Sequence, residues 1–169
     1  MEGSPIGDRS RGSIGKMTIR RPIANDADKL VDLWLRSVRA THDFLSESDV
    51  QTFLPFVREY LSSTDSDLWV LVSDGEDVMG FMGMSRNKME ALFIDPRFHR
   101  RGGGRRLVEH AGQLYGELTV DVNEQNALAR RFYESCGFGA EGRSPVDGMG
   151  KPFPLLHLRL KPRPLSAEE

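Results

Sequence analysis

The chain has 169 residues, of which 38% are hydrophobic, and a formal net charge of −2. This length predicts one folded domain whose core needs neither disulfides nor a metal. The balanced charge argues against nucleic acid as the partner, and the single cysteine excludes an internal disulfide framework. Since the sequence shows neither a membrane-length apolar run nor the apolar centre of a secretion signal, we expect a cytoplasmic protein without a membrane partner.

Residues 1–16 contain four glycines and few apolar side chains, which predicts a flexible extension ahead of the domain. The domain itself is expected over 17–160. It begins with an alternating strand at 18–23. Asn25 is the expected N-cap of a helix with one apolar face, formed by Leu30, Leu33, Trp34, Leu35 and Val38.

A second helix is expected after Ser46, and Pro55 is predicted to kink or divide it. Three strands follow, at 67–73, 78–85 and 88–95, and the short turns between them predict an antiparallel meander. The methionines of these strands are interpreted as packing residues: Met79, Met82, Met84 and Met89.

The C-terminal part alternates between strands and a helix. A strand at 117–123 is expected to run parallel to the previous one because a helix crosses between them. The helix at 126–136, with Leu128, Phe132 and Cys136 on one stripe, should stop at a left-handed Gly137. A strand from Phe138, a loop at 144–154, a last strand bearing Leu156, Leu158 and Leu160, and a frayed tail at 161–169 complete the chain.

The most informative stretch is a run of three glycines between the strand that ends at Asp95-Pro96 and the next helix: Gly102, Gly103 and Gly104. Consecutive glycines suit a tight turn or a close approach to the backbone amides. The start of a helix favours a bound anion such as phosphate, and neighbouring arginines strengthen that preference. A solvated basic loop is the alternative interpretation.

Two other phosphate loops are excluded by the residues that follow the glycines. A Walker loop requires Gly-Lys-Ser/Thr, whereas Gly104 precedes Arg105 and Arg106. A dinucleotide-binding loop requires a third glycine where this chain has Leu107.

The stretch instead resembles the pyrophosphate loop of the GNAT superfamily, the acyl-CoA-dependent N-acetyltransferases. The family's hydrophobic-x-hydrophobic-x-Pro strand end and its two loop glycines correspond to Leu92, Ile94, Pro96, Gly102 and Gly104. His99 departs from the pattern, since Arg or Gln is usual there. Residues 123–138 are similar to a second family signature, Asn-x-x-Ala-x-x-Phe-Tyr-x-x-x-Gly-Phe.

The resemblance implies an α/β (α+β) fold with a mixed central sheet of roughly six to seven strands flanked by about four helices. It also implies an enzyme that transfers an acetyl group from acetyl-CoA to a primary amine of a small molecule or protein, by direct attack in a ternary complex. A non-catalytic acyl-CoA-binding sensor or regulatory module is the alternative. Whether the chain forms a homodimer stays open.

The same resemblance assigns cofactor-binding residues. The pyrophosphate would bind at the loop formed by His99, Arg100, Arg101, Gly102, Gly103, Gly104 and Arg105. The CoA arm would lie along Leu92, Phe93 and Ile94, where the strand must splay from its parallel neighbour. The backbone amides of Phe93 and Ile94 would polarise the thioester carbonyl. Asn126 corresponds to a residue that hydrogen-bonds the arm, with a helix cap as the alternative.

Acid and base candidates follow from the chemistry of amine acylation. Tyr133 is the expected general acid, because a phenol with a pKa of about 10 keeps its proton near neutral pH and can donate it to the leaving thiolate, although Tyr133 also suits packing beside Phe132. Glu90 and His42 compete as the base, and a surface carboxylate and a helix-end histidine are the plainer interpretations. His110 and His157 are expected on outward faces, and no spacing suggests a metal site. The helix pair around 41–61 and the loop 144–154 should frame the acceptor.

Overall fold

The computed structural model describes residues 16–162. The strands are β1 (Thr18–Arg20), β2 (Asp67–Val72), β3 (Val78–Ser85), β4 (Lys88–Ile94), β5 (Leu118–Asn123), β6 (Gly139–Ser144) and β7 (Leu155–Leu160). The helices are α1 (Asp26–Thr41), α2 (Glu47–Ser62), α3 (Gly103–Tyr115) and α4 (Ala127–Ser135), with a 3-10 helix η1 (Pro96–Phe98). The expected extension and tail lie outside the described residues, apart from Lys16, Lys161 and Pro162.

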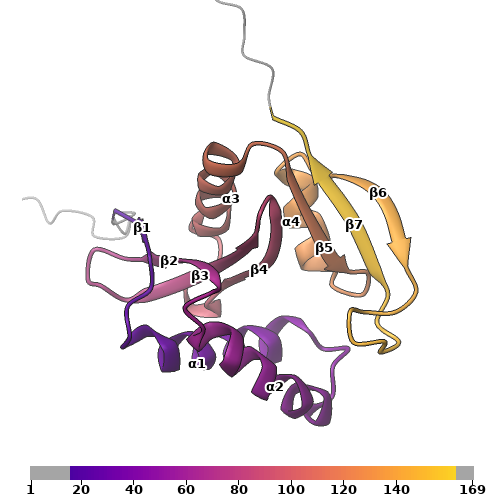
Figure 1. Cartoon of the computed structure of the whole chain (residues 1–169), viewed down its shortest axis with the longest axis horizontal. Coiled ribbons are helices and arrows are strands. Elements are labelled where there is room, and N and C mark those ends of the chain that lie inside the picture. The colour runs from indigo at the N-terminus through magenta and orange to yellow at the C-terminus, as the bar shows by residue number, and fades with distance from the viewer. Residues whose placement is uncertain (1–15, 163–169) are drawn as a thin grey trace, which may run out of the picture.

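The strands form one mixed sheet in the order β1-β2-β3-β4-β5-β7-β6, with helices on both faces (Figure 1). Strands β1 to β4 pair antiparallel, β4 and β5 are parallel, and β7 returns antiparallel between β5 and β6. The predicted fold class and the predicted meander are therefore confirmed. Among residues 16–162, no helix combines the length and the apolar character that crossing a membrane requires.

The helix starts differ from the prediction in one place. Ser46 caps α2 as expected, in a capping box where its hydroxyl accepts from the amide of Asp49 at 3.1 Å. Asn25 precedes α1, but its side chain makes no cap bond. Asp26 fixes that turn instead, because its carboxylate accepts from the amide of Ile23 at 2.8 Å. Helix α2 is not divided at Pro55.

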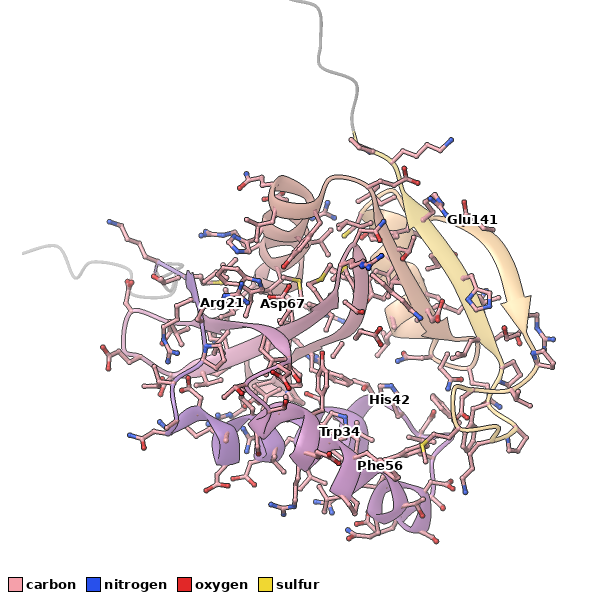
Figure 2. The ribbon with its side chains drawn as sticks, viewed as in Figure 1. Arg21, Trp34, His42, Phe56, Asp67 and Glu141 are labelled. Carbon is pink, nitrogen blue, oxygen red and sulfur yellow. The ribbon has the colours of Figure 1, made fainter. Side chains whose placement is uncertain are left out.

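Two hydrophobic cores lie on opposite faces of the sheet. Helices α1 and α2 pack against β2, β3 and β4, with Trp34 buried in this layer (Figure 2). Helix α3 and Tyr133 of α4 pack on the other face, together with the four predicted methionines and with Val120, Val122 and Leu158 of β5 and β7. Strands β5 to β7 contribute no residue to the α1–α2 core, so those two helices cover only part of their face.

The contact between β4 and β5 is short, and it determines where a ligand can enter. Only Lys88 and Met89 pair with β5, opposite Thr119 and Val120. On its other side β4 pairs Met89 with Met84 and Ala91 with Gly83, which leaves Glu90 as an extra, bulged residue. A bulge bends the strand that carries it. Beyond Glu90 the two strands separate, which confirms the predicted splay.

Candidate functional site

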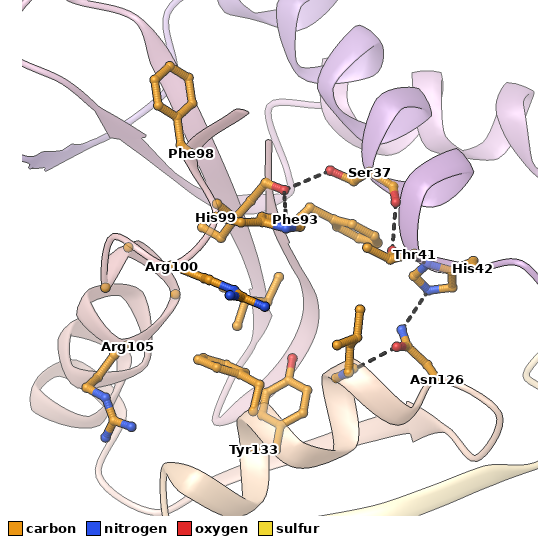
Figure 3. A pocket seen from close by; sticks show the side chains of 18 residues that line it. Ser37, Thr41, His42, Phe93, Phe98, His99, Arg100, Arg105, Asn126 and Tyr133 are labelled. Atoms are coloured by element: carbon orange, nitrogen blue, oxygen red, sulfur yellow. Dashed lines mark hydrogen bonds between the residues drawn. The ribbon is translucent and has the colours of Figure 1, made fainter. Parts of the chain in front are cut away.

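A cleft of about 510 Å³ lies where β4 and β5 separate (Figure 3). It is lined by most of the predicted cofactor residues: Leu92, Phe93, Ile94, His99, Arg100, Gly102, Gly103, Gly104, Arg105, Asn126 and Tyr133. His42 lines it as well. Two predicted residues do not: the guanidinium of Arg101 lies over the Phe98 ring at 5.4 Å, and Glu90 lies exposed at the bulge.

The glycine run closes the junction between loop, helix and sheet. Gly102 is the N-cap of α3 and has a left-handed backbone with φ of 80°. A Cβ atom on Gly103 would lie 2.7 Å from Leu71, and one on Gly104 would lie 3.0 Å from Phe132. These glycines therefore let the start of α3 approach both the sheet and α4. The amides of the first turn of α3 then meet the cleft, where they can bind a diphosphate.

The backbone of β4 offers amides to the cleft from alternate residues only. The Asp95 amide donates to the Met79 carbonyl at 2.8 Å, and Phe93 is paired with Phe81. Because alternate amides of a strand face the same side, the Phe93 amide also faces β3. The amides of Leu92 and Ile94 then face the cleft. The prediction for the Phe93 amide is therefore wrong, although Phe93 is one of the residues that line the cleft.

His99 anchors the loop. Its Nε2 lies 3.1 Å from the Ile94 carbonyl, which also accepts from the Ser37 hydroxyl at 3.0 Å. These two contacts fasten the end of β4 to both the loop and α1. His99, which stands where the family pattern has Arg or Gln, therefore has a structural role in the loop.

Tyr133 occupies the opposite wall. Its side chain is buried, and its ring packs edge-on against Phe132 and Phe138. The expected packing beside Phe132 is therefore confirmed. The Tyr133 hydroxyl nevertheless points into the cleft (Figure 3). Burial, with a smaller effect of Cys136, raises the pKa of Tyr133 above its usual value. The phenol is therefore protonated at neutral pH and able to donate.

A chain of hydrogen bonds crosses the cleft from α1 to α4 (Figure 3). The Thr41 hydroxyl donates to the Ser37 carbonyl at 2.7 Å and lies 2.8 Å from His42 Nδ1. Asn126 Oδ1 accepts from the Ala129 amide at 3.1 Å, which leaves Asn126 Nδ2 to face His42 Nε2 at 3.2 Å. His42 is therefore a neutral imidazole with its proton on Nδ1. The helix-cap interpretation of Asn126 is confirmed.

This environment disfavours His42 as the base. Burial lowers the pKa of His42 to about 4, although the nearby Asp43 opposes the shift. Its Nε2 already accepts a hydrogen bond from Asn126. A group with so low a pKa takes up protons poorly near neutrality. The ring instead links α1 to α4 and packs against Phe44.

Glu90 is exposed at the bulge, next to the point where β4 parts from β5. Burial, and after it the charge of Glu90, raise the pKa of Tyr60, on α2, to about 12. Farther along, Phe44 and Phe153 lie 6.0 Å apart and join the α1–α2 segment to the 144–154 loop. These are the segments predicted to frame the acceptor.

Two residues, Leu128 and His110, lie where the sequence analysis did not place them. Leu128 was assigned to an apolar stripe but is 55% exposed and lines the cleft. His110 packs edge-on against Trp69 at 4.5 Å. His157 is held by Asp121 and Ser144. The alternation of β5 and β7 would have placed Asp121 and His157 on one face. No three His, Cys, Asp or Glu side chains within residues 16–162 are arranged to hold a metal ion.

The sequence and the structure were compared with known proteins. The model of the GNAT acetyltransferase domain matches residues 64–139. Over 142 residues the chain is 47% identical to the peptidyl-lysine N-acetyltransferase YjaB of Escherichia coli (strain K12), covering 84% of this chain and 95% of that protein. It is 30% identical to the peptidyl-lysine N-acetyltransferase YiaC of the same organism, covering 71% and 82%.

Solved structures agree with the sequence comparison. The solution structure of apo YjaB from Escherichia coli superposes with a TM-score of 0.80 at 46% identity, covering 85% of this chain and 97% of that one. The PaiA N-acetyltransferase of Thermoplasma acidophilum, crystallised with coenzyme A, has a TM-score of 0.68 at 19% identity, covering 86% and 99%. At that identity the similarity concerns the fold alone.

Proposed function

Since the chain belongs to the GNAT acetyltransferases and transfers acetyl groups from acetyl-CoA to amines, we propose that its acceptor is the ε-amine of a lysine in a protein or peptide. Two relatives, at 47% and 30% identity, are peptidyl-lysine N-acetyltransferases. The observation that carries the proposal is the separation of β4 from β5 directly after Met89, next to the exposed carboxylate of Glu90.

The described residues fit acetyl-CoA, which supplies the activated acetyl thioester. The first turn of α3 and the guanidinium groups of Arg100 and Arg105 offer positive potential for the diphosphate. The cleft between β4 and α4 suits an extended arm, and the amides of Leu92 and Ile94 offer it strand-like hydrogen bonds. Arg101 is a weaker candidate because its side chain lies on Phe98.

Each catalytic step is assigned to a group of this chain. The Ile94 amide is a fixed dipole facing the cleft and is suited to polarising the acetyl carbonyl. Tyr133 donates its phenolic proton to the leaving sulfur. Glu90 accepts the proton of the incoming ammonium, directly or through water. His42 and Asn126 hold the walls of the cleft at a fixed separation.

We further propose that the protein acts in the cytoplasm, where acetyl-CoA is available. A non-catalytic acyl-CoA sensor is not favoured, because the relatives at 47% and 30% identity are enzymes. The hydroxyl of Tyr133, which points into the cleft, also argues for catalysis.

The acceptor is tested by incubating the enzyme with acetyl-CoA and N-terminally blocked peptides that contain one lysine. We expect free CoA thiol to appear together with an acetylated lysine in the mass spectrum. Peptides with arginine in place of lysine serve as the control. Transfer only to spermidine or to unblocked α-amines would overturn the lysine assignment and leave the acetyltransferase activity intact.

A further inference from the structure

Asp121 stands at the point where the sheet opens. The last β4–β5 pair is Met89 with Val120, so Glu90 and Asp121 are the first residues beyond it on the two strands. Val120 and Val122 are buried against the α3–α4 core, so Asp121 faces the opposite side of the sheet. Helices α1 and α2 do not cover β5 there. Asp121 therefore lies on the face of the sheet that α1 and α2 leave uncovered, at the point where β4 and β5 part.

The carboxylate of Asp121 contacts two side chains, His157 and Lys88. His157 Nδ1, on the neighbouring strand β7, lies 2.6 Å from Asp121 Oδ1. Since an ionised carboxylate only accepts, Nδ1 donates, and Nε2 of the same ring lies 2.7 Å from the Ser144 hydroxyl. Burial opposes ionisation, but hydrogen bonds from Lys88 and His157 outweigh it and hold the pKa of Asp121 below its usual range. Asp121 is thus a charged group with a fixed orientation.

The second oxygen of that carboxylate binds a lysine ammonium of the chain itself. Lys88 Nζ lies 2.8 Å from Asp121 Oδ2 and remains 41% exposed. The hydrogen bond to Asp121, and after it the charges of Asp121 and Glu90, raise the pKa of Lys88. Two carboxylates at the opening of the sheet therefore already stabilise one primary ammonium. An acceptor lysine has the same chemistry.

We propose that Asp121, oriented by His157 and Ser144, binds the acceptor ammonium opposite Glu90, and that Lys88 occupies this place until an acceptor lysine replaces it. The inference rests on the proposed function, since it assigns the subsite for the lysine acceptor. Asp121 is the binding residue and His157 is a positioning residue. Lys88 is an internal competitor, because its ammonium must leave Asp121 Oδ2 before another can bind there.

Steady-state kinetics of acetyl transfer to a lysine peptide test this assignment through opposite effects. Asp121→Asn should raise the KM for the peptide by about 10- to 100-fold, the range expected on losing a hydrogen bond to a charge. His157→Phe should raise it by about two- to tenfold with little change in kcat. Lys88→Met should lower it by about two- to fivefold, since a half-exposed ion pair no longer has to break.

Arg159→Gln is the matched control, because Arg159 is ion-paired with Glu117 and Glu141 near the other end of the same strands. Its KM should stay within twofold of the wild type. The affinity for CoA should be equal in all four variants, which shows that each is folded. An Asp121→Asn variant with unchanged KM, or a Lys88→Met variant with a raised KM, would overturn the proposal.

A binding measurement separates this proposal from the proposed function. In the presence of CoA, N-α-acetyl-lysine amide should shift the backbone amide resonances of Asp121 and Thr119, and Asp121→Asn should abolish the shift. Binding without transfer to any lysine peptide would overturn the lysine acceptor while supporting the subsite. Transfer to lysine peptides with no response at Asp121 would overturn the subsite alone.

Discussion

The two sides of the cleft are built in different ways. The donor side consists of backbone and tightly packed glycines: the amides of β4 and α3, with Gly103 and Gly104 against neighbouring elements. The acceptor side consists of side chains that meet from separate strands and loops, such as Glu90 and His157. Backbone geometry suits a cosubstrate that never changes. Side chains from distant segments can be exchanged one at a time, which suits an acceptor that differs between relatives.

The strongest test of this comparison is Tyr133→Phe, which removes a proton donor from the donor side. We expect kcat to fall by about 100-fold or more, the usual contribution of a general acid, while the affinity for CoA is kept. Stopped assays of CoA release and titration with CoA measure the two quantities.

Tyr115→Phe is the control, because the Tyr115 hydroxyl is bonded to Asp67, outside the cleft. Equal losses in the two variants would show that packing, and not proton donation, explains the effect of Tyr133.

The second test concerns His42, which joins the two sides. Its pKa is lowered from 6.5 to about 4, so the folded state binds fewer protons than the unfolded state between these values. Stability should therefore decrease as the pH falls from about 6.5 to about 4, by about 3 kcal/mol. Urea unfolding at several pH values should show this loss in the wild type and a smaller one in His42→Gln.

Activity gives a second view of the same residue. The pH profiles of the wild type and of His42→Gln should have the same shape between pH 6 and 9, because a group with a pKa of about 4 does not titrate there. A limb that disappears in His42→Gln would return the role of base to His42.

The smallest effects, on the free energy of unfolding, are expected from replacing the N-cap glycine of α3 and a glycine within that helix. Gly102→Ala should destabilise the fold by about 1 kcal/mol, because φ is 80° although the space around a Cβ is open. Gly112→Ala has similar open space and helical geometry, so it should stabilise the fold by about 0.5–1 kcal/mol. Thermal unfolding measures both changes. A stabilised Gly102→Ala variant would contradict the assigned backbone strain.

Local signals were enough to predict most helices and strands, whereas the fold class followed from the family resemblance. The Ser46 cap, the left-handed Gly137 and the β3–β4 hairpin with its short turn depend on neighbouring residues, and all three are present. Asn25 failed as a cap because Asp26, with Arg20 as its partner, holds the turn. That contact joins a strand and a helix, so no periodic pattern of residues in the sequence predicts it.

For the site, the residues that line the cleft were mostly predicted, but the direction of a backbone amide and the pKa of a histidine were not. Cleft residues such as Gly102 and Tyr133 follow from motifs, since the motif and the ligand contact occupy the same segment. The direction of the Phe93 amide depends on strand register, which the bulge at Glu90 changes. The low pKa of His42 depends on its burial in the assembled fold, and its hydrogen-bond partner Asn126 lies 84 residues away in the sequence. Such properties belong to the assembled sheet and not to any one segment.

Because β4 pairs only briefly with β5, the exchange of its backbone amides can report whether CoA is bound. The Leu92 and Ile94 amides face the cleft, where no strand pairs with them. Their hydrogens should exchange with deuterium quickly in the free enzyme and slowly once the arm of CoA lies beside them. The amides of Phe93 and Asp95 face β3, so their exchange should change far less. Isotope exchange at four consecutive residues thus distinguishes the empty enzyme from the loaded one without any turnover.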